Sequence, residues 1–150
     1  MLARLDSAMD KILVAIDGSK HSPRVVDFAV QLAESINGSL LLVNVTPDMP
    51  VPEGYSEYAK EEGVAPGGYS EEISRGVLEN MADRVKGVKF ETASAVGNPA
   101  ELILSIAKSK RATMIVLGVF GLHHLSRIRS LGSVARRVVE NSDLPVVLVP

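Results

Sequence analysis

Residues 11–17 are Lys-Ile-Leu-Val-Ala-Ile-Asp, an almost continuous apolar run that ends in an aspartate. Such a run is typical of a β-strand that is buried on both faces of a parallel sheet. Ser22 and Pro23 follow a few residues later, with serine as the expected N-cap of a helix and proline at its first position. We therefore expect a buried strand that leads directly into a helix.

The alternation of apolar runs and amphipathic segments continues to the end of the chain. Asn98 is the expected N-cap of a later helix, with Pro99 in the first turn and Glu101 at the capping-box position. Strands that alternate with helices predict a three-layer α/β/α fold with a parallel sheet, whose ligands bind beyond the carboxyl ends of the strands. Further strands are expected at 40–45, 88–96, 113–117 and 144–149.

Residues 46–68 interrupt this alternation, because prolines and glycines cluster there. A long loop without structure of its own is uncommon inside a compact domain and is often a lid or a mobile excursion. All three tyrosines, Tyr55, Tyr58 and Tyr69, lie in or beside this long variable loop. Their rings could close over a nucleotide base, since aromatic faces stack on bases. The alternative is a mobile excursion in which the tyrosines are incidental.

Length and composition limit the possible classes of protein. The 150 residues fit one domain spanning 1–150, with residues 1–9 as an N-terminal extension. A formal net charge of −2 gives no general attraction to nucleic acids or membranes, and the absence of cysteine excludes disulfides and thiol catalysis. No apolar run approaches the roughly 20 residues that span a bilayer, and no signal-peptide pattern opens the chain, so we expect a cytoplasmic protein.

The segment 117–134 carries the pattern that bears most directly on function. It is Leu-Gly-Val-Phe-Gly-Leu-His-His-Leu-Ser-Arg-Ile-Arg-Ser-Leu-Gly-Ser-Val. The preceding strand is expected to run into Gly118, and an amphipathic helix is expected to begin at Gly132, so turns and helix N–H groups could together bind phosphate. Basic residues between them would add charge-assisted contacts: His123, His124, Arg127 and Arg129. The alternative is an ordinary solvated loop between a strand and a helix.

Asp17 also has two interpretations. It could accept hydrogen bonds from adenine or ribose or help to place a metal, or it could cap the Asp-Gly-Ser turn as an Asx motif. Ser19 and Ser22 are expected to be caps rather than ligands. His123 and His124 are adjacent, and adjacent side chains rarely converge on one ion, so we expect no metal site held by histidines. Mg²⁺ or Mn²⁺ is expected only together with a bound nucleotide.

Five segments in this order make the chain resemble the universal stress protein family over essentially its whole length: 11–19, 40–45, 97–101, 118–133 and 144–150. The resemblance implies a five-stranded parallel sheet with strand order 3-2-1-4-5 and usually a homodimer. A dimer formed through residues 145–149 would cover the apolar final strand, which is expected at an exposed edge of the sheet.

Nucleotide-binding members of this family carry the motif Gly-x2-Gly-x9-Gly-(Ser/Thr). Here ten residues, 122–131, separate the second and third glycines, and Phe120 stands where a basic residue or histidine is common. The resemblance implies adenine and ribose near Asp17 and Val45, and phosphates at the glycines and Ser133. Together with the basic residues and the strand ends named above, the full predicted nucleotide site comprises Ala15, Ile16, Asp17, Val45, Gly97, Leu117, Gly118, Gly121, His123, Arg127, Arg129, Gly132, Ser133 and Val134.

The function implied by the resemblance is that of a sensor or regulator in a stress response, which binds ATP, AMP or ADP and acts on protein partners that the sequence does not identify. P-loop, dinucleotide and nucleophile-elbow motifs are absent, and no residue stands out as a base, so any ATP hydrolysis should be slow. The main alternative is a dimeric adaptor of the same fold that works without nucleotide. A phosphotransferase or adenylylating enzyme is a third possibility with less support.

Overall fold

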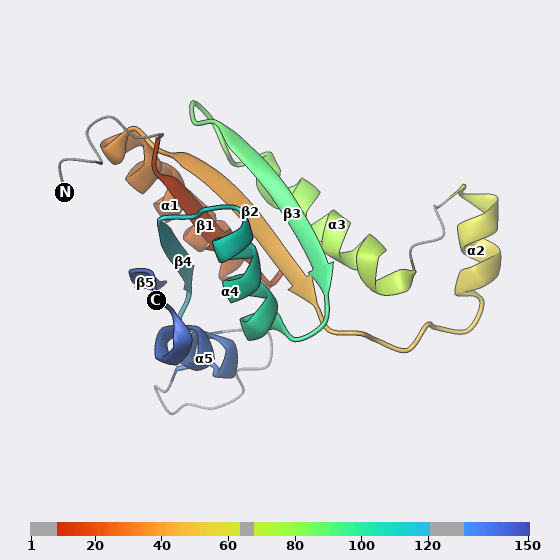
Figure 1. The fold of residues 1–150 in the computed structure, drawn as a ribbon. Coiled ribbons are helices and arrows are strands. Elements are labelled where there is room, and N and C mark those ends of the chain that lie inside the picture. The colour runs from red at the N-terminus through yellow and green to blue at the C-terminus, as the bar shows by residue number, and fades with distance from the viewer. Residues whose placement is uncertain (1–8, 64–67, 121–130) are drawn as a thin grey trace.

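The computed structural model describes residues 9–63, 68–120 and 131–150, and the following structural statements concern these residues. Strands and helices alternate along the chain, apart from two successive helices between the second and third strands (Figure 1). The elements are β1 (Lys11–Ala15), α1 (Ser22–Ile36), β2 (Ser39–Thr46), α2 (Tyr55–Glu61), α3 (Tyr69–Ala82), β3 (Phe90–Val96), α4 (Pro99–Ser109), β4 (Met114–Gly118), α5 (Ser133–Asn141) and β5 (Val146–Val149).

The strands form one parallel sheet with the order β3-β2-β1-β4-β5. This confirms the predicted α/β fold and its strand order 3-2-1-4-5. The order reverses at β1, which pairs with β2 on one side and with β4 on the other. In open parallel sheets the crevice at such a reversal is where ligands bind, so the carboxyl ends of β1 and β4 mark the expected site.

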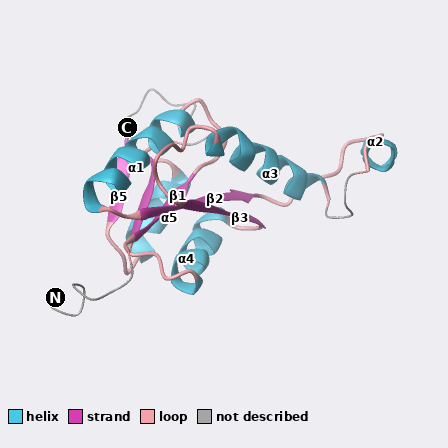
Figure 2. Cartoon of the chain, turned by 90° about the horizontal axis from the view of Figure 1, so that it is seen from above, coloured by secondary structure: helices cyan, strands magenta, loops and turns pink. Residues whose placement is uncertain are grey.

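Helices cover both faces of the sheet, α1 and α3 on one and α4 and α5 on the other (Figure 2). Successive side chains of β1 point to opposite faces. Ile12 and Val14 belong to the core on the α1 side, whereas Leu13 belongs to the core on the α4 side, and all three are fully buried. Because both faces of β1 are covered, its sequence is apolar throughout rather than alternating.

The starts of α1 and α4 differ in how well the sequence predicted them. Asn98 caps α4 as expected, since its Oδ1 accepts a hydrogen bond from the Glu101 amide at 3.1 Å. The prediction that Ser22 caps α1 is wrong, because Ser22 lies inside the helix and the N-cap position is His21. The Ser22 hydroxyl instead donates to Asp17 Oδ1 at 3.2 Å.

Replacing Asn98 by alanine should lower the free energy of unfolding by about 1 kcal/mol, because the Glu101 amide loses its acceptor. Urea denaturation followed by circular dichroism measures this change. Asn80→Ala in α3 is the matched control, since Asn80 is exposed and does not cap a helix. An Asn98→Ala variant as stable as the wild type would show that the cap contributes nothing.

The prediction of a loop without structure over 46–68 is wrong for its middle, where α2 spans Tyr55–Glu61. Ala59, Lys60 and Glu61 are good helix formers, and Gly54 at the N-cap adopts φ +82°. No residue of α2 is buried, and Figure 1 shows the helix away from the sheet. Local propensity rather than packing against the core therefore forms α2, which hydrophobic periodicity could not reveal.

β5 lies at the edge of the sheet, as predicted, but it is shorter than the expected 144–149. Pro145 has no N–H for the ladder, although its carbonyl accepts from the Ile115 amide at 3.0 Å. Ser142 Oγ accepts from the Leu144 amide at 3.0 Å and so holds a turn just before the strand. No helix in the described parts of the chain is both long and apolar enough to cross a membrane.

Candidate functional site

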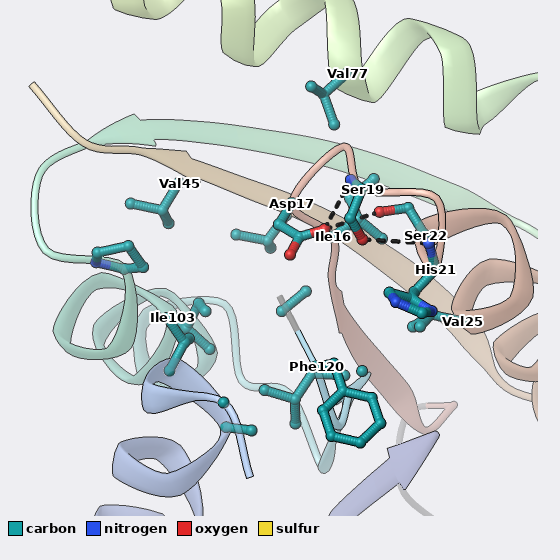
Figure 3. Close-up of a pocket in the computed structure, with 18 of the residues that line it drawn as sticks. Ile16, Asp17, Ser19, His21, Ser22, Val25, Val45, Val77, Ile103 and Phe120 are labelled. Atoms are coloured by element: carbon teal, nitrogen blue, oxygen red, sulfur yellow. Dashed lines mark hydrogen bonds between the residues drawn. The ribbon is translucent and has the colours of Figure 1, made fainter. Parts of the chain in front are cut away.

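A cavity of about 630 Å³ lies at the carboxyl ends of β1, β2 and β4, where the strand order reverses (Figure 3). Its volume falls within the roughly 300–1,000 Å³ that is usual for small-molecule sites. Most of the side chains that line it are apolar. The predicted site residues that line it are Ala15, Ile16, Asp17, Val45, Leu117, Gly118, Gly132, Ser133 and Val134.

The other predicted site residues are not placed at this cavity. Gly97 follows β3 and does not line it. Its φ of +146° and the 2.9 Å that would separate an added Cβ from Leu102 Cδ1 explain a glycine at this turn by conformation and packing alone. Gly121, His123, Arg127 and Arg129 lie outside the described residues.

Asp17 sits at the tight turn between β1 and α1. Its Oδ1 accepts hydrogen bonds from the Ser19 amide at 2.9 Å and from Ser22 Oγ at 3.2 Å, while Ser22 Oγ accepts from the Gly18 amide at 3.1 Å. The Asx-turn interpretation is thus realised in the structure. Among the described residues, no hydrogen bond reaches Oδ2, so the carboxylate that lines the cavity keeps one oxygen available to a ligand.

The wall contributed by α3 was missed in the sequence analysis. Ile73 and Val77 line the cavity, and a Cβ added to Gly18 would lie 2.9 Å from Val77 Cγ2. Gly18 also has φ +79°, so both its backbone and this close approach require glycine. The apolar spacing of α3 predicted a helix, but nothing local in the sequence showed which loop the helix would contact.

On the β4–α5 side of the cavity, hydrogen bonds join the residue after the end of β4 at Gly118 to the start of α5 at Gly132. The Gly132 amide donates to the Val119 carbonyl at 2.8 Å, and the Val119 amide donates to the Val149 carbonyl at 3.0 Å. Gly132 is the N-cap of α5, and the helix begins at Ser133, which lines the cavity. The prediction that a helix begins here is confirmed. The first-turn N–H groups of such a helix favour anions.

Asn44 forms a buried polar network beneath the cavity. Its side chain donates to the Ile16 carbonyl at 2.8 Å and accepts from Thr46 Oγ1 at 2.9 Å, while Ser74 Oγ donates to the Asn44 carbonyl at 3.2 Å. Asn44 is only 3% exposed, and Ile16 and Thr46 line the cavity. The network therefore joins β1, β2 and α3 just behind the cavity wall. An asparagine inside an apolar run was the signal that could have indicated it.

The three tyrosines cluster between α2 and the first residue of α3, rather than at the cavity. The Tyr55 ring lies 5.2 Å from that of Tyr69 and 6.1 Å from that of Tyr58, between centroids. Tyr55 Oη donates to Glu72 Oε2 at 2.6 Å, and this hydrogen bond raises the pKa of Tyr55 to about 12. None of the three tyrosines lines the cavity. The structure thus does not place them over a base.

Phe120 and His21 form the cavity wall nearest the start of α1 (Figure 3). Their ring centroids are 6.2 Å apart, and the ring planes are tilted by 54°. The Phe120 ring therefore packs at the wall, and the volume given above remains open with the ring in place. Among the described residues, no group of three or more His, Asp or Glu side chains is arranged to hold a metal ion.

Comparison with known proteins identifies relatives over nearly the whole chain. The model of the universal stress protein family matches residues 9–150. Universal stress protein YxiE of Bacillus subtilis is 35% identical over 157 residues, which cover 93% of this chain and 98% of that protein. A crystal structure of a universal stress protein in complex with cAMP is 27% identical, with a TM-score of 0.66, and the match covers 96% of this chain and 98% of the other.

The fold comparison agrees with the sequence comparison. Universal stress protein UspA from Lactobacillus plantarum has a TM-score of 0.69 at 22% identity, with coverage of 97% of this chain and 100% of the other. The strand order and the helical layers thus agree with the family that the sequence similarity indicates. This chain belongs to the universal stress protein family.

Proposed function

We propose that this chain binds an adenine nucleotide, ATP, in the cavity at the carboxyl ends of β1, β2 and β4, and that it acts as a nucleotide-dependent regulator in a stress response. One observation carries the proposal. The Asp17 carboxylate, the end of β4 at Gly118 and the start of α5 at Ser133 line a single cavity. A hydrogen-bond acceptor for a nucleoside and N–H groups that favour anions thus face the same space.

The proposed placement of the nucleotide follows from these groups. Adenine and ribose lie near Asp17 and Val45, where the wall is largely apolar, and the phosphates lie near Gly118, Gly132 and Ser133. The cAMP complex of a family member that is 27% identical to this chain supports an adenine nucleotide as the ligand class. The predicted contacts of Gly121, His123, Arg127 and Arg129 remain part of the proposal.

A divalent cation, Mg²⁺ or Mn²⁺, is proposed to arrive with the nucleotide rather than to be held by the protein. Asp17 is the only carboxylate among the described residues that line the cavity. Mg²⁺ prefers phosphate oxygens and water to an all-protein cage, so one carboxylate suffices. We further propose a homodimer through residues 145–149, because β5 is an edge strand that pairing would cover. At most slow hydrolysis of ATP is part of this proposal.

A nucleotide-independent adaptor is the second candidate, and Phe120 favours it. An apolar ring packs at the wall where a basic residue or histidine is common in nucleotide-binding members, and this reduces the charge available to phosphates. Native mass spectrometry of the purified protein separates the two candidates. A dimer that carries the added mass of AMP, ADP or ATP supports nucleotide binding, whereas an unliganded dimer favours the adaptor.

Calorimetric titration with ATP and Mg²⁺ tests the proposal directly. The wild type should bind with micromolar affinity, about −8 kcal/mol, and Gly132→Val should weaken binding at least about tenfold by adding a branched side chain at the phosphate end. Gly76→Val is the matched control, because Gly76 lies on α3 in open space and does not line the cavity. A flat titration of folded wild-type protein would reject nucleotide binding.

A further inference from the structure

The described wall of the cavity contains almost no charge. Asp17 and His21 are the only ionisable side chains among the described residues that line it, and neither lysine nor arginine occurs there. A phosphate chain that leaves water needs hydrogen-bond donors or positive charge to replace its hydration. Apart from backbone amides and hydroxyl groups, His21 is therefore the one described side chain in this wall that can supply a donor.

Two backbone hydrogen bonds fix the position of His21. Its amide donates to Ser19 Oγ at 3.2 Å, and its carbonyl accepts from the Val25 amide at 3.2 Å as α1 begins. The imidazole then lies between the β1–α1 turn and the Phe120 ring, whose centroid is 6.2 Å away (Figure 3). The ring is thus held at the wall by its backbone and by Phe120.

His21 has no structural task that uses its ring nitrogens. Within the described parts of the chain, neither ring nitrogen makes a hydrogen bond or an ion pair. The Asp17 carboxylate makes no hydrogen bond or ion pair with the ring; its Oδ1 accepts from the Ser19 amide and the Ser22 hydroxyl. The imidazole is half-buried, so it is restrained by its neighbours and still open to the cavity.

We infer that His21 donates a ring N–H to the phosphate chain of the bound nucleotide from the α1 side of the cavity. The start of α5 at Ser133 lines the β4–α5 side of the same space, so a phosphate group there meets first-turn N–H groups of α5 on one side and His21 on the other. His21 thereby makes the site selective for phosphorylated nucleotides over adenosine. This inference rests on the proposed nucleotide function.

The test compares the affinities for ATP, AMP and adenosine by calorimetry in wild type, His21→Phe and His21→Gln. His21→Phe keeps an aromatic ring against Phe120 but removes the donor, so binding of ATP and AMP should weaken about tenfold, the usual effect of a hydrogen bond to a charged group. Adenosine should bind within about twofold of the wild type, because it lacks the phosphate. His21→Gln restores an N–H donor and should recover part of the loss.

Lys20→Gln is the matched control. Lys20 is adjacent and exposed but does not line the cavity, so its variant should keep the wild-type ratio of ATP to adenosine affinity. His21→Ala should show the same loss as His21→Phe, which guards against a phenylalanine variant that fails to fold. A wild type that binds ATP together with His21 variants of unchanged ratio overturns this inference alone. A wild type that binds neither adenosine nor ATP overturns the proposed function and the inference with it.

Discussion

Replacing Asn44 by leucine is expected to lower the free energy of unfolding by about 3 kcal/mol. Leucine has nearly the same size, but it leaves the Ile16 carbonyl and the Thr46 hydroxyl without their partner, and each buried polar group that loses its partner costs about 1–3 kcal/mol. Urea denaturation measures the effect. Because Ile16 and Thr46 line the cavity, the same variant should also weaken ATP binding.

Thr46→Val separates the two halves of this network. It removes only the hydroxyl that donates to Asn44 Oδ1, so it should cost about 1 kcal/mol, the net value of one hydrogen bond. The double variant should cost less than the sum of the two single changes, because the residues share a bond. An Asn44→Leu variant within about 0.5 kcal/mol of the wild type would show that the network does not stabilise the fold.

The features that the sequence predicted well depend on neighbours along the chain. The buried strand predicted at 11–17 and the Asn98 cap each follow from a few adjacent side chains, and the structure has the cap and a strand over Lys11–Ala15. Gly132 at the start of α5 belongs to the same class, since the apolar spacing of the helix begins there. The order of the strands came from the resemblance to a family rather than from any local pattern.

The features that were missed depend on residues distant in sequence. Asn44 meets Ile16 across 28 positions and Ser74 across 30, and no local rule pairs them. Val77 packs on Gly18 only because α3 covers the same face of the sheet as α1. Such contacts are made by the assembled layers, so the α3 wall and the buried network become visible only in the three-dimensional structure.

Ser22 shows how a longer-range contact overrides a local rule. Serine before proline is a good N-cap signal and predicts a helix that begins at Pro23, but α1 begins at Ser22 with His21 at the N-cap. The Asp17 carboxylate, five residues earlier, offers the hydroxyl a charged acceptor, and the helix starts one residue sooner than the rule predicts. The same bond also holds Asp17 at the cavity, so a contact that the local cap rule does not include contributes to the geometry of the candidate site.

Asp17→Asn is expected to weaken ATP binding by about 10- to 100-fold, since a hydrogen bond to a charged group contributes about 1.5–3 kcal/mol. Asparagine keeps a carbonyl oxygen for the Ser19 amide and the Ser22 hydroxyl, so the turn should survive. What it loses is the second carboxylate oxygen, which accepts from the nucleoside in the proposed complex. Calorimetry with ATP measures the loss, and thermal unfolding verifies that the turn persists.

Asp17→Ala and Asp27→Asn complete the comparison. Asp17→Ala also removes the acceptor of the turn, so it should lose both affinity and stability. Asp27→Asn affects only the exposed ion pair between Asp27 on α1 and Arg84, which follows α3, and should leave binding unchanged. Suppose Asp17→Asn binds ATP as tightly as the wild type while Asp17→Ala is merely less stable. The carboxylate would then serve the turn alone, and the nucleoside would have to be held by the apolar wall and the backbone around Val45.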